Sequence, residues 1–254
     1  MILAIISGFI VAALIPITSK SIGGKGSIVM PFLPLLLFVY FLQYLPQVSK
    51  GDAIDLIYQW VPSSGINLAF HLDGLALLFI LMITGIGALV FFYTYSYLKG
   101  HVYLDRFYGY LSMFMASMLG LVLSDNIITL FIFWELTSIS SFFLIGFNNE
   151  DPKSRKSALL ALSITGMGGL FLLVGMIFLG TVGGSYSFQE LLTQRSLIIN
   201  HSSYGWIIGL LFLGAFTKSA QFPFHFWLPG AMKAPTPVST YLHSATMVKA
   251  GIYL

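Results

Sequence analysis

Apolar residues fill this sequence in eight long stretches, which short polar segments separate. Each stretch holds about 17–25 residues, the length that one α-helix needs to cross the hydrocarbon core of a bilayer. The predicted helices are Met1–Ile17, Ile28–Leu45, Gly74–Leu98, Phe107–Ser124, Asn126–Phe147, Ser157–Val182, Tyr204–Leu228 and Pro237–Leu254. This pattern predicts an all-α fold, a polytopic transmembrane helical bundle of about eight membrane helices.

The composition supports this class, because 57% of the 254 residues are hydrophobic and only 8% are charged. Soluble domains carry about 25% charged residues. The chain has no cysteine, which excludes disulfides, Cys-ligated iron–sulfur clusters and thiol catalysis within it. The net charge of +3 does not indicate nucleic-acid binding, because the basic residues fall mainly in short loops between apolar stretches.

The two ends of the chain suggest a part of a longer protein. The first apolar stretch has no basic leader and no clear cleavage site, so we expect a retained helix, not a signal peptide. The last stretch stops at Leu254 without an exit loop. We expect residues 1–106 to form three N-terminal helices with an external loop. Residues 107–254 would then be the first, truncated repeat of an inverted-repeat transporter.

Basic residues are distributed unequally between the two sets of loops. Loops after even-numbered helices carry two, Lys50 and Arg195, and loops after odd-numbered helices carry eight. Those eight are Lys20, Lys25, Lys99, Arg106, Lys153, Arg155, Lys156 and Lys233. The positive-inside rule therefore places the odd loops in the cytoplasm and the N-terminus outside the cell inner (plasma) membrane.

Three segments between or within the helices have their own patterns. Gln59–Leu72 contains Pro62 and Gly65 and alternating apolar residues, which predict a turn and a short extended stretch on the outer face. Phe188–Leu197 is typical of a short amphipathic surface helix. A stripe of small residues at every fourth position would let the sixth helix approach a neighbour closely. The stripe consists of Ser157, Ala161, Thr165 and Gly169.

Other polar residues carry simpler predictions. Asp73 and Asp125 each stand at the start of a predicted helix and are expected to be N-caps. His71, His101 and His201 fall in loops. No spacing indicates a phosphate-binding loop, a zinc site or a hydrolase nucleophile. We therefore predict no catalytic residue, no metal site and no cofactor.

Two residues of opposite charge lie inside apolar stretches long enough to cross a bilayer: Glu135 in Asn126–Phe147 and Lys218 in Tyr204–Phe222. A charge at the bilayer centre costs roughly 2.5–3.5 kcal/mol on insertion scales, and such residues usually mark a proton or ion pathway. Burial disfavours the charged form of each group, whereas the opposite charge of the other group favours it. A Glu–Lys pair whose separation changes is thus predicted to be a proton switch; the alternative is a structural ion pair.

The segment after Lys218 cannot be one regular helix. It contains four prolines, Pro223, Pro229, Pro235 and Pro237, and proline lacks the backbone donor that an α-helix needs. A broken turn beside an intramembrane lysine leaves polar backbone groups that must line a cavity or water. This context favours a functional Lys218 over a purely structural one.

Three further candidate relay residues follow Lys218: His225 within the proline-rich segment, and His243 and Lys249 in the eighth predicted helix. His243 titrates near neutral pH and could pass protons between water chains; the alternative is a neutral histidine bonded to a backbone carbonyl. Lys249 is of the same kind as Lys218, and His225 completes the candidate relay. A b-type cytochrome with His225 and His243 as haem ligands is disfavoured, because the proline-rich break argues against ligands on two rigid facing helices.

Several motifs resemble the antiporter-like proteins shared by respiratory complex I and the Mrp cation/proton antiporters. Phe133–Phe147 is similar to their glutamate helix, and Lys218–Pro229 is similar to their lysine helix. Ala234–Ser239 and Leu242–Gly251 complete the pattern, and His71–Leu75 resembles the start of their third helix. Together these motifs extend over essentially the whole chain.

The resemblance implies inverted five-helix repeats with broken helices in each half. It implies that Glu135 and Lys218 are the central pair, and that His243 and Lys249 continue the path toward the second repeat. The implied function is that of a membrane subunit of a multisubunit cation/proton antiporter, a secondary transporter and not an enzyme. Its partners would be H⁺, a monovalent cation expected to be Na⁺, the lipid bilayer and other membrane subunits, with no nucleic acid.

Two branches of this family compete. Lys249 favours the large A-type chain of Mrp-type Na⁺/H⁺ antiporters, because the distal chain of complex I tends to have an uncharged residue there. Under the alternative, the chain is a proton-pumping membrane subunit of a NADH–quinone oxidoreductase. A third possibility is an assembly scaffold that transports nothing, for which Glu135→Gln would leave exchange unchanged.

Overall fold

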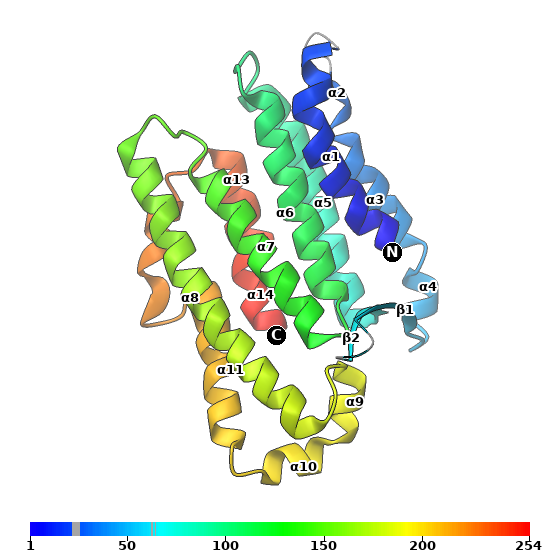
Figure 1. The fold of residues 1–254 in the computed structure, drawn as a ribbon. Helices are drawn as coiled ribbons and strands as arrows, with labels where there is room; N and C mark the ends of the chain where they lie inside the picture. Colours follow the sequence, from blue (N-terminus) through cyan, green and yellow to red (C-terminus); the bar gives the residue numbers. More distant parts are fainter. Residues whose placement is uncertain (22–25, 62, 64) are drawn as a thin grey trace.

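The computed structural model describes residues 1–21, 26–61, 63 and 65–254, which fold into a bundle of roughly parallel and antiparallel helices (Figure 1). Four of its helices are long and apolar enough to cross a membrane. They are α5 (Gly74–Tyr97), α6 (Leu104–Leu123), α7 (Ile127–Ile145) and α8 (Pro152–Gly183). The fold is therefore mostly helical, as the apolar pattern predicts.

Other apolar helices occupy the remaining predicted stretches. The N-terminal ones are α1 (Ile2–Ser21), α2 (Gly26–Val29), α3 (Phe32–Leu42) and α4 (Leu45–Val48). Helix α1 packs along α6, and α3 packs along α5. Helix α6 consequently lies in the interior, between α1 and α7 (Figure 1), and most of its side chains are buried.

The prediction of one continuous helix over Tyr204–Leu228 is wrong. Helix α11 (Tyr204–Lys218) ends at the lysine, and a short 3₁₀ helix, η2 (Phe224–Trp227), and α12 (Leu228–Ala231) follow. The stretch Pro237–Leu254 is likewise divided into α13 (Thr236–Thr240), a π-helical turn η3 (Tyr241–Ala245) and α14 (Met247–Tyr253). Proline explains the first division, because Pro223 cannot continue the hydrogen-bond ladder of α11.

One end of the bundle carries a β-hairpin. Strands β1 (Ile54–Val61) and β2 (Ile66–Leu72) pair antiparallel, with Ile54 opposite Leu72 and Asp55 opposite His71. The predicted extended stretch is thus confirmed as β2, but its partner strand begins earlier than Gln59. The predicted surface helix Phe188–Leu197 is instead two short helices, α9 (Phe188–Thr193) and α10 (Arg195–Asn200). These helices lie at the same end as the hairpin (Figure 1).

Helix caps show one confirmed prediction and one error. The Asp73 carboxylate accepts a hydrogen bond from the Ala76 backbone N–H at 2.8 Å and caps α5. Asp125, in contrast, does not cap α7. The adjacent Asn126 does, because its side-chain oxygen accepts from the backbone N–H groups of Ile128 and Thr129.

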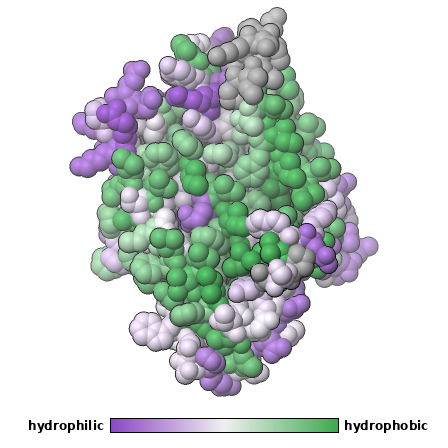
Figure 2. All heavy atoms as spheres, in the orientation of Figure 1, coloured by the Kyte–Doolittle hydropathy of each residue, from purple (hydrophilic) through white to green (hydrophobic). Residues whose placement is uncertain are grey.

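The surface has the distribution expected of a membrane protein. Figure 2 shows hydrophobic side chains over the middle of the molecule and hydrophilic residues concentrated toward its two ends. Large apolar side chains in the long helices, such as Leu89 and Leu170, are well exposed. Outward apolar faces of this kind suit contact with lipid tails.

Candidate functional site

Lys218 lies in the centre of the helix bundle, at the C-terminal end of α11. Its side chain is fully buried. Its Nζ donates hydrogen bonds to the main-chain carbonyl of Trp134 and to Oγ of Ser138, both at 2.7 Å, and lies 4.9 Å from the centroid of the Trp134 ring. One face of α7 therefore supplies a carbonyl, a hydroxyl and an aromatic face to a single buried amine.

Glu135 is the next residue of α7, and its side chain points toward α8. A Cβ added at Gly169 of α8 would overlap its Oε1 atom. That oxygen is buried, and no described residue gives it a hydrogen bond. Glu135 and Lys218 interact electrostatically, but the only ion pair within the described residues joins His71 to Asp55. The two charges predicted to act together are thus neighbours and not a closed ion pair.

The small-residue stripe on α8 makes these close approaches possible. Its four members, Ser157, Ala161, Thr165 and Gly169, are all buried, as predicted for a packing face. Gly168, beside the stripe, has a similar role, because a Cβ there would overlap Thr217 of α11. Glycine and other small residues let helix backbones approach closely inside a membrane, and here they leave room for polar side chains.

The backbone break after Lys218 is held by side chains from later elements. Trp227 of η2 donates its indole N–H to the Thr217 carbonyl at 2.9 Å. Ser219 donates its hydroxyl to the Val248 carbonyl of α14 at 2.8 Å. Ala220, within the break, has a positive φ of 51°, which is uncommon for a residue other than glycine. The Thr217 carbonyl just before the break therefore has a side-chain partner, as polar backbone inside a bilayer requires, and the Ser219 hydroxyl ties the break to α14.

The other three predicted relay residues lie in different surroundings. His243 in η3 is partly buried, and both of its ring nitrogens lack a hydrogen-bond partner within the part of the chain that the structure describes. The alternative of a histidine bonded to a backbone carbonyl of those residues is therefore wrong. Lys249 in α14 is partly buried, one residue after the carbonyl that Ser219 contacts. His225 is exposed and stacks on Phe222, away from the buried pair.

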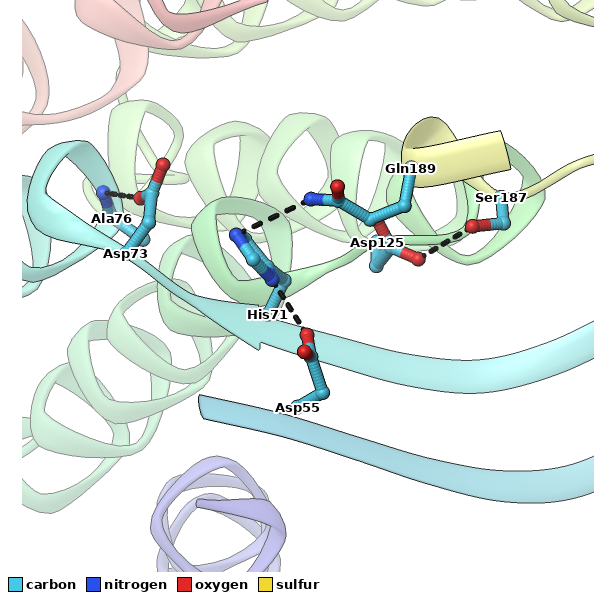
Figure 3. Close-up of polar contacts among 7 residues, drawn as sticks. All are labelled: Asp55, His71, Asp73, Ala76, Asp125, Ser187 and Gln189. Atoms are coloured by element: carbon cyan, nitrogen blue, oxygen red, sulfur yellow. Dashed lines mark hydrogen bonds and ion pairs between the residues drawn. The ribbon is translucent and has the colours of Figure 1, made fainter. Parts of the chain in front are cut away.

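A second polar cluster, at the hairpin end, does not follow from the sequence pattern. His71 Nδ1 contacts Asp55 Oδ1 at 2.6 Å, and its Nε2 lies 3.3 Å from the side-chain nitrogen of Gln189 (Figure 3). Asp125 accepts a hydrogen bond from Ser187 at 2.7 Å. His71, Asp125 and Gln189, from three distant segments, thus meet in one cleft of about 420 Å³. The motif around His71 is the only sequence signal, and it does not reveal these partners.

Electrostatics distinguish Asp125 from an ordinary surface carboxylate. It lies between α6 and α7, outside the long helices, and is only 9% exposed. Burial raises the pKa of its carboxyl, an effect that the Ser187 hydrogen bond partly opposes. Across the described residues, no group of three or more His, Asp or Glu side chains is arranged to hold a metal ion.

Comparison with known proteins links this geometry to a family. The family described as "NADH:quinone oxidoreductase/Mrp antiporter, TM" matches residues 124–254, which include every residue of the buried site. The family described as "NADH-Ubiquinone oxidoreductase (complex I), chain 5 N-terminus" matches residues 60–108. The first match alone covers more than half of the chain.

Similar curated proteins belong to the antiporter branch. The A-type chain of the Na(+)/H(+) antiporter of Alkalihalophilus pseudofirmus is 50% identical over 99% of this chain and 31% of its own length. The A1-type chain of the Na(+)/H(+) antiporter of Staphylococcus haemolyticus is 48% identical, over 99% of this chain and 32% of its own. The chain therefore spans about a third of the length of these relatives.

Solved structures show the same architecture. A chain of the Mrp complex from Dietzia sp. DQ12-45-1b matches with a TM-score of 0.85 and 38% identity, over 99% of this chain and 27% of that one. A chain of the archaeal membrane-bound sulfane sulfur reductase shares the fold, with a TM-score of 0.83 at 24% identity, over 99% and 51%. The chain belongs to the NADH:quinone oxidoreductase/Mrp antiporter family of membrane proteins.

Proposed function

We propose that this chain is part of a membrane subunit of a multisubunit Na⁺/H⁺ antiporter, and that Lys218 and Glu135 form the centre of its proton path. The observation that carries the proposal is a fully buried amine held by α7 beside a carboxyl oxygen without a partner among the described residues. The names of the similar proteins support antiport over the redox alternative.

The surroundings of Lys218 suit both protonation states of its amine. An ammonium has three donors and no acceptor, and it can donate to the Trp134 carbonyl and the Ser138 hydroxyl together. A neutral amine has a lone pair, to which the Ser138 hydroxyl can donate instead. The aromatic face of Trp134 adds cation–π stabilisation to the charged state alone. The hydrogen bonds around the amine can therefore adjust to proton release by rotation of one hydroxyl.

Glu135 then acts as the electrostatic control. Its negative charge favours the ammonium form of Lys218, and its neutralisation or withdrawal favours release of the proton. His243, whose two ring nitrogens have no partner among the described residues, is the next acceptor in our scheme, and Lys249 follows it. His225, exposed on η2, is an outlying member of the path.

We propose the membrane topology that the sequence pattern predicts. We propose eight membrane helices: α5 to α8, together with the other apolar elements before α5 and after α10. Residues 1–106 would form an N-terminal unit and residues 107–254 the first inverted repeat. The N-terminus lies near the hairpin end in Figure 1. Both would face the outer side of the plasma membrane.

Exchange measured in everted membrane vesicles containing the assembled complex tests the relay. Lys218→Ala should abolish Na⁺-driven collapse of the pH gradient. Lys218→Arg should do so as well, since arginine keeps the charge but does not release its proton. Lys233→Ala, which removes an exposed lysine, is the matched control and should retain exchange. Full exchange by Lys218→Ala in a complex that still contains all its subunits would disprove the relay.

A further inference from the structure

We propose that a groove between α6, α7 and α8 binds the phosphate of one anionic phospholipid. The groove has a volume of about 330 Å³ and lies at the end of the bundle opposite the hairpin, where α7 connects to α8 (Figure 1). Its wall includes Arg106, Arg155, Tyr110, Phe143 and Leu159. We call it the arginine groove. This inference does not depend on the proton relay.

The two arginines give the arginine groove a positive charge. The guanidinium carbon of Arg106 lies 4.4 Å from the Tyr103 ring centroid and 5.5 Å from that of Phe147. Its Nε is buried, and no described residue accepts a hydrogen bond from it. Arg155 donates one hydrogen bond, to the Asn149 carbonyl at 2.6 Å. Aromatic rings thus hold the Arg106 guanidinium in place, and a backbone carbonyl holds that of Arg155. Both groups keep N–H donors that can bind a ligand.

No carboxylate forms an ion pair with these arginines within the described residues. The one ion pair found there joins His71 and Asp55, at the other end of the bundle. Three acidic residues are close in sequence, Asp105 in the first turn of α6 and Glu150 and Asp151 just before α8, but none of them lines the arginine groove. A planar guanidinium matches the geometry of phosphate oxygens, so an anion of this class is the complementary ligand.

The apolar wall indicates why the phosphate should belong to a lipid. Tyr110 and Phe143 stack with their ring centroids 5.0 Å apart, and they form part of the same wall as Leu159. Leu159 is 56% exposed and Phe143 is 38% exposed. A free phosphate ion would gain nothing from this surface, whereas the acyl chains of a lipid can pack against it by van der Waals contact.

The position along the bundle fits the same ligand. Three lysines lie at the same end of the bundle as the two arginines: Lys99 in the loop before α6, and Lys153 and Lys156 at the start of α8. Anionic lipids are attracted to clusters of basic residues next to membrane helices, and each Lys or Arg near the surface adds to that attraction. A headgroup in the arginine groove would place its acyl chains against α7 and α8.

Native mass spectrometry of the detergent-purified complex tests this proposal. The complex is stripped of lipid and titrated with dioleoyl phosphatidylglycerol or dioleoyl phosphatidylcholine, which share acyl chains but differ in net charge. We expect the anionic lipid to bind about tenfold more tightly, and Arg106→Gln with Arg155→Gln to abolish that preference. Arg155→Gln alone, at a more exposed position, should reduce it about fivefold if the double variant fails to assemble.

The controls separate the possible sources of the effect. Lys50→Gln with Arg195→Gln removes the same charge from the opposite end of the bundle and should keep the preference for the anionic lipid. Leu159→Asn should weaken both lipids alike. Equal binding of the two lipids by the unchanged complex would overturn the proposal. Displacement of bound phosphatidylglycerol by an equal concentration of inorganic phosphate would assign the site to a free anion, and a neighbouring polypeptide occupying the groove in the assembled complex would also overturn it.

Discussion

The ammonium group of Lys218 donates a hydrogen bond to the main-chain carbonyl of Trp134, which lies 84 residues earlier in the chain. Trp134 is the residue immediately before Glu135. The lysine therefore binds the backbone of the helix that carries the acid, and the position of its amine relative to that backbone is set by α7 itself. A change in the Glu135 rotamer can alter the distance between the charges while the amine stays in place.

Ser138→Ala, which removes a single hydroxyl group, should impair exchange. The substitution leaves the Trp134 carbonyl as the one remaining hydrogen-bond partner of the Lys218 amine among the described residues, and a hydrogen bond to a charged group contributes about 1.5–3 kcal/mol. We expect the exchange rate to fall by roughly tenfold, as measured by Na⁺-driven collapse of the pH gradient in everted vesicles.

Ser138→Thr serves as its control, because threonine retains the hydroxyl. It should keep most of the exchange activity. Equal loss in the two variants would show that the size of residue 138 matters and the hydroxyl does not.

Gly169→Ala should disable the site by displacing Glu135. The added methyl group would overlap the buried Oε1 atom, so the carboxyl or α8 must move. Gly166→Ala on the same helix is the matched control, since a Cβ there meets nothing within 4 Å. Both changes raise helix propensity by about 1 kcal/mol, so propensity cannot explain a difference between them. We expect exchange to be lost in the first variant and unchanged in the second, with both complexes assembled.

Hydrophobic periodicity is sufficient to predict most of the helices and one packing face. Long apolar stretches predict α5 to α8, and the spacing of small residues predicts the buried side of α8. These features depend on local sequence, which a single chain displays directly. The burial of Glu135 and Lys218 near each other also agrees with the pattern, because charges in apolar stretches need polar surroundings.

The partners of the polar residues cannot be predicted in the same way. Opposite charges suggest that Lys218 contacts Glu135, yet the amine binds Trp134 and Ser138. The sequence pattern favours Asp125 as the cap of α7, but the next residue has the side-chain geometry for the role. Such choices depend on how helices distant in sequence pack together, and neither propensity nor periodicity contains that information.

The stability of the hairpin end should depend on pH through Asp125. Its folded pKa is above the ordinary value of 3.8, mainly because of burial. The folded state therefore binds the proton more tightly, and stability falls as pH rises from that ordinary value through the raised pKa. Asp125→Asn removes this dependence. Hydrogen exchange of α9, measured from about pH 4 to about pH 7 and corrected for the intrinsic rate, should show a flatter profile in the variant.

Asp52→Asn is the control for this measurement, because Asp52 is an exposed carboxylate at the same end of the molecule. Its profile should match that of the unmodified protein. If Asp125→Asn also leaves the pH profile of hydrogen exchange unchanged, protonation of the Asp125 carboxyl does not affect the stability of α9.

Trp227 should prove essential for the geometry of the break after Lys218. Its indole N–H is donated to the Thr217 carbonyl, one residue before the lysine, and its side chain is fully buried. Trp227→Phe removes this donor and leaves a buried carbonyl without it, at a cost of about 1–3 kcal/mol. Because that carbonyl adjoins Lys218, exchange should fall together with the thermal stability of the complex. Trp206→Phe, at a side chain that is 73% exposed, makes the same chemical change and should alter neither. An unchanged exchange rate and melting temperature in Trp227→Phe would mean that the remaining hydrogen bonds, such as that of Ser219 to Val248, are sufficient to hold the break.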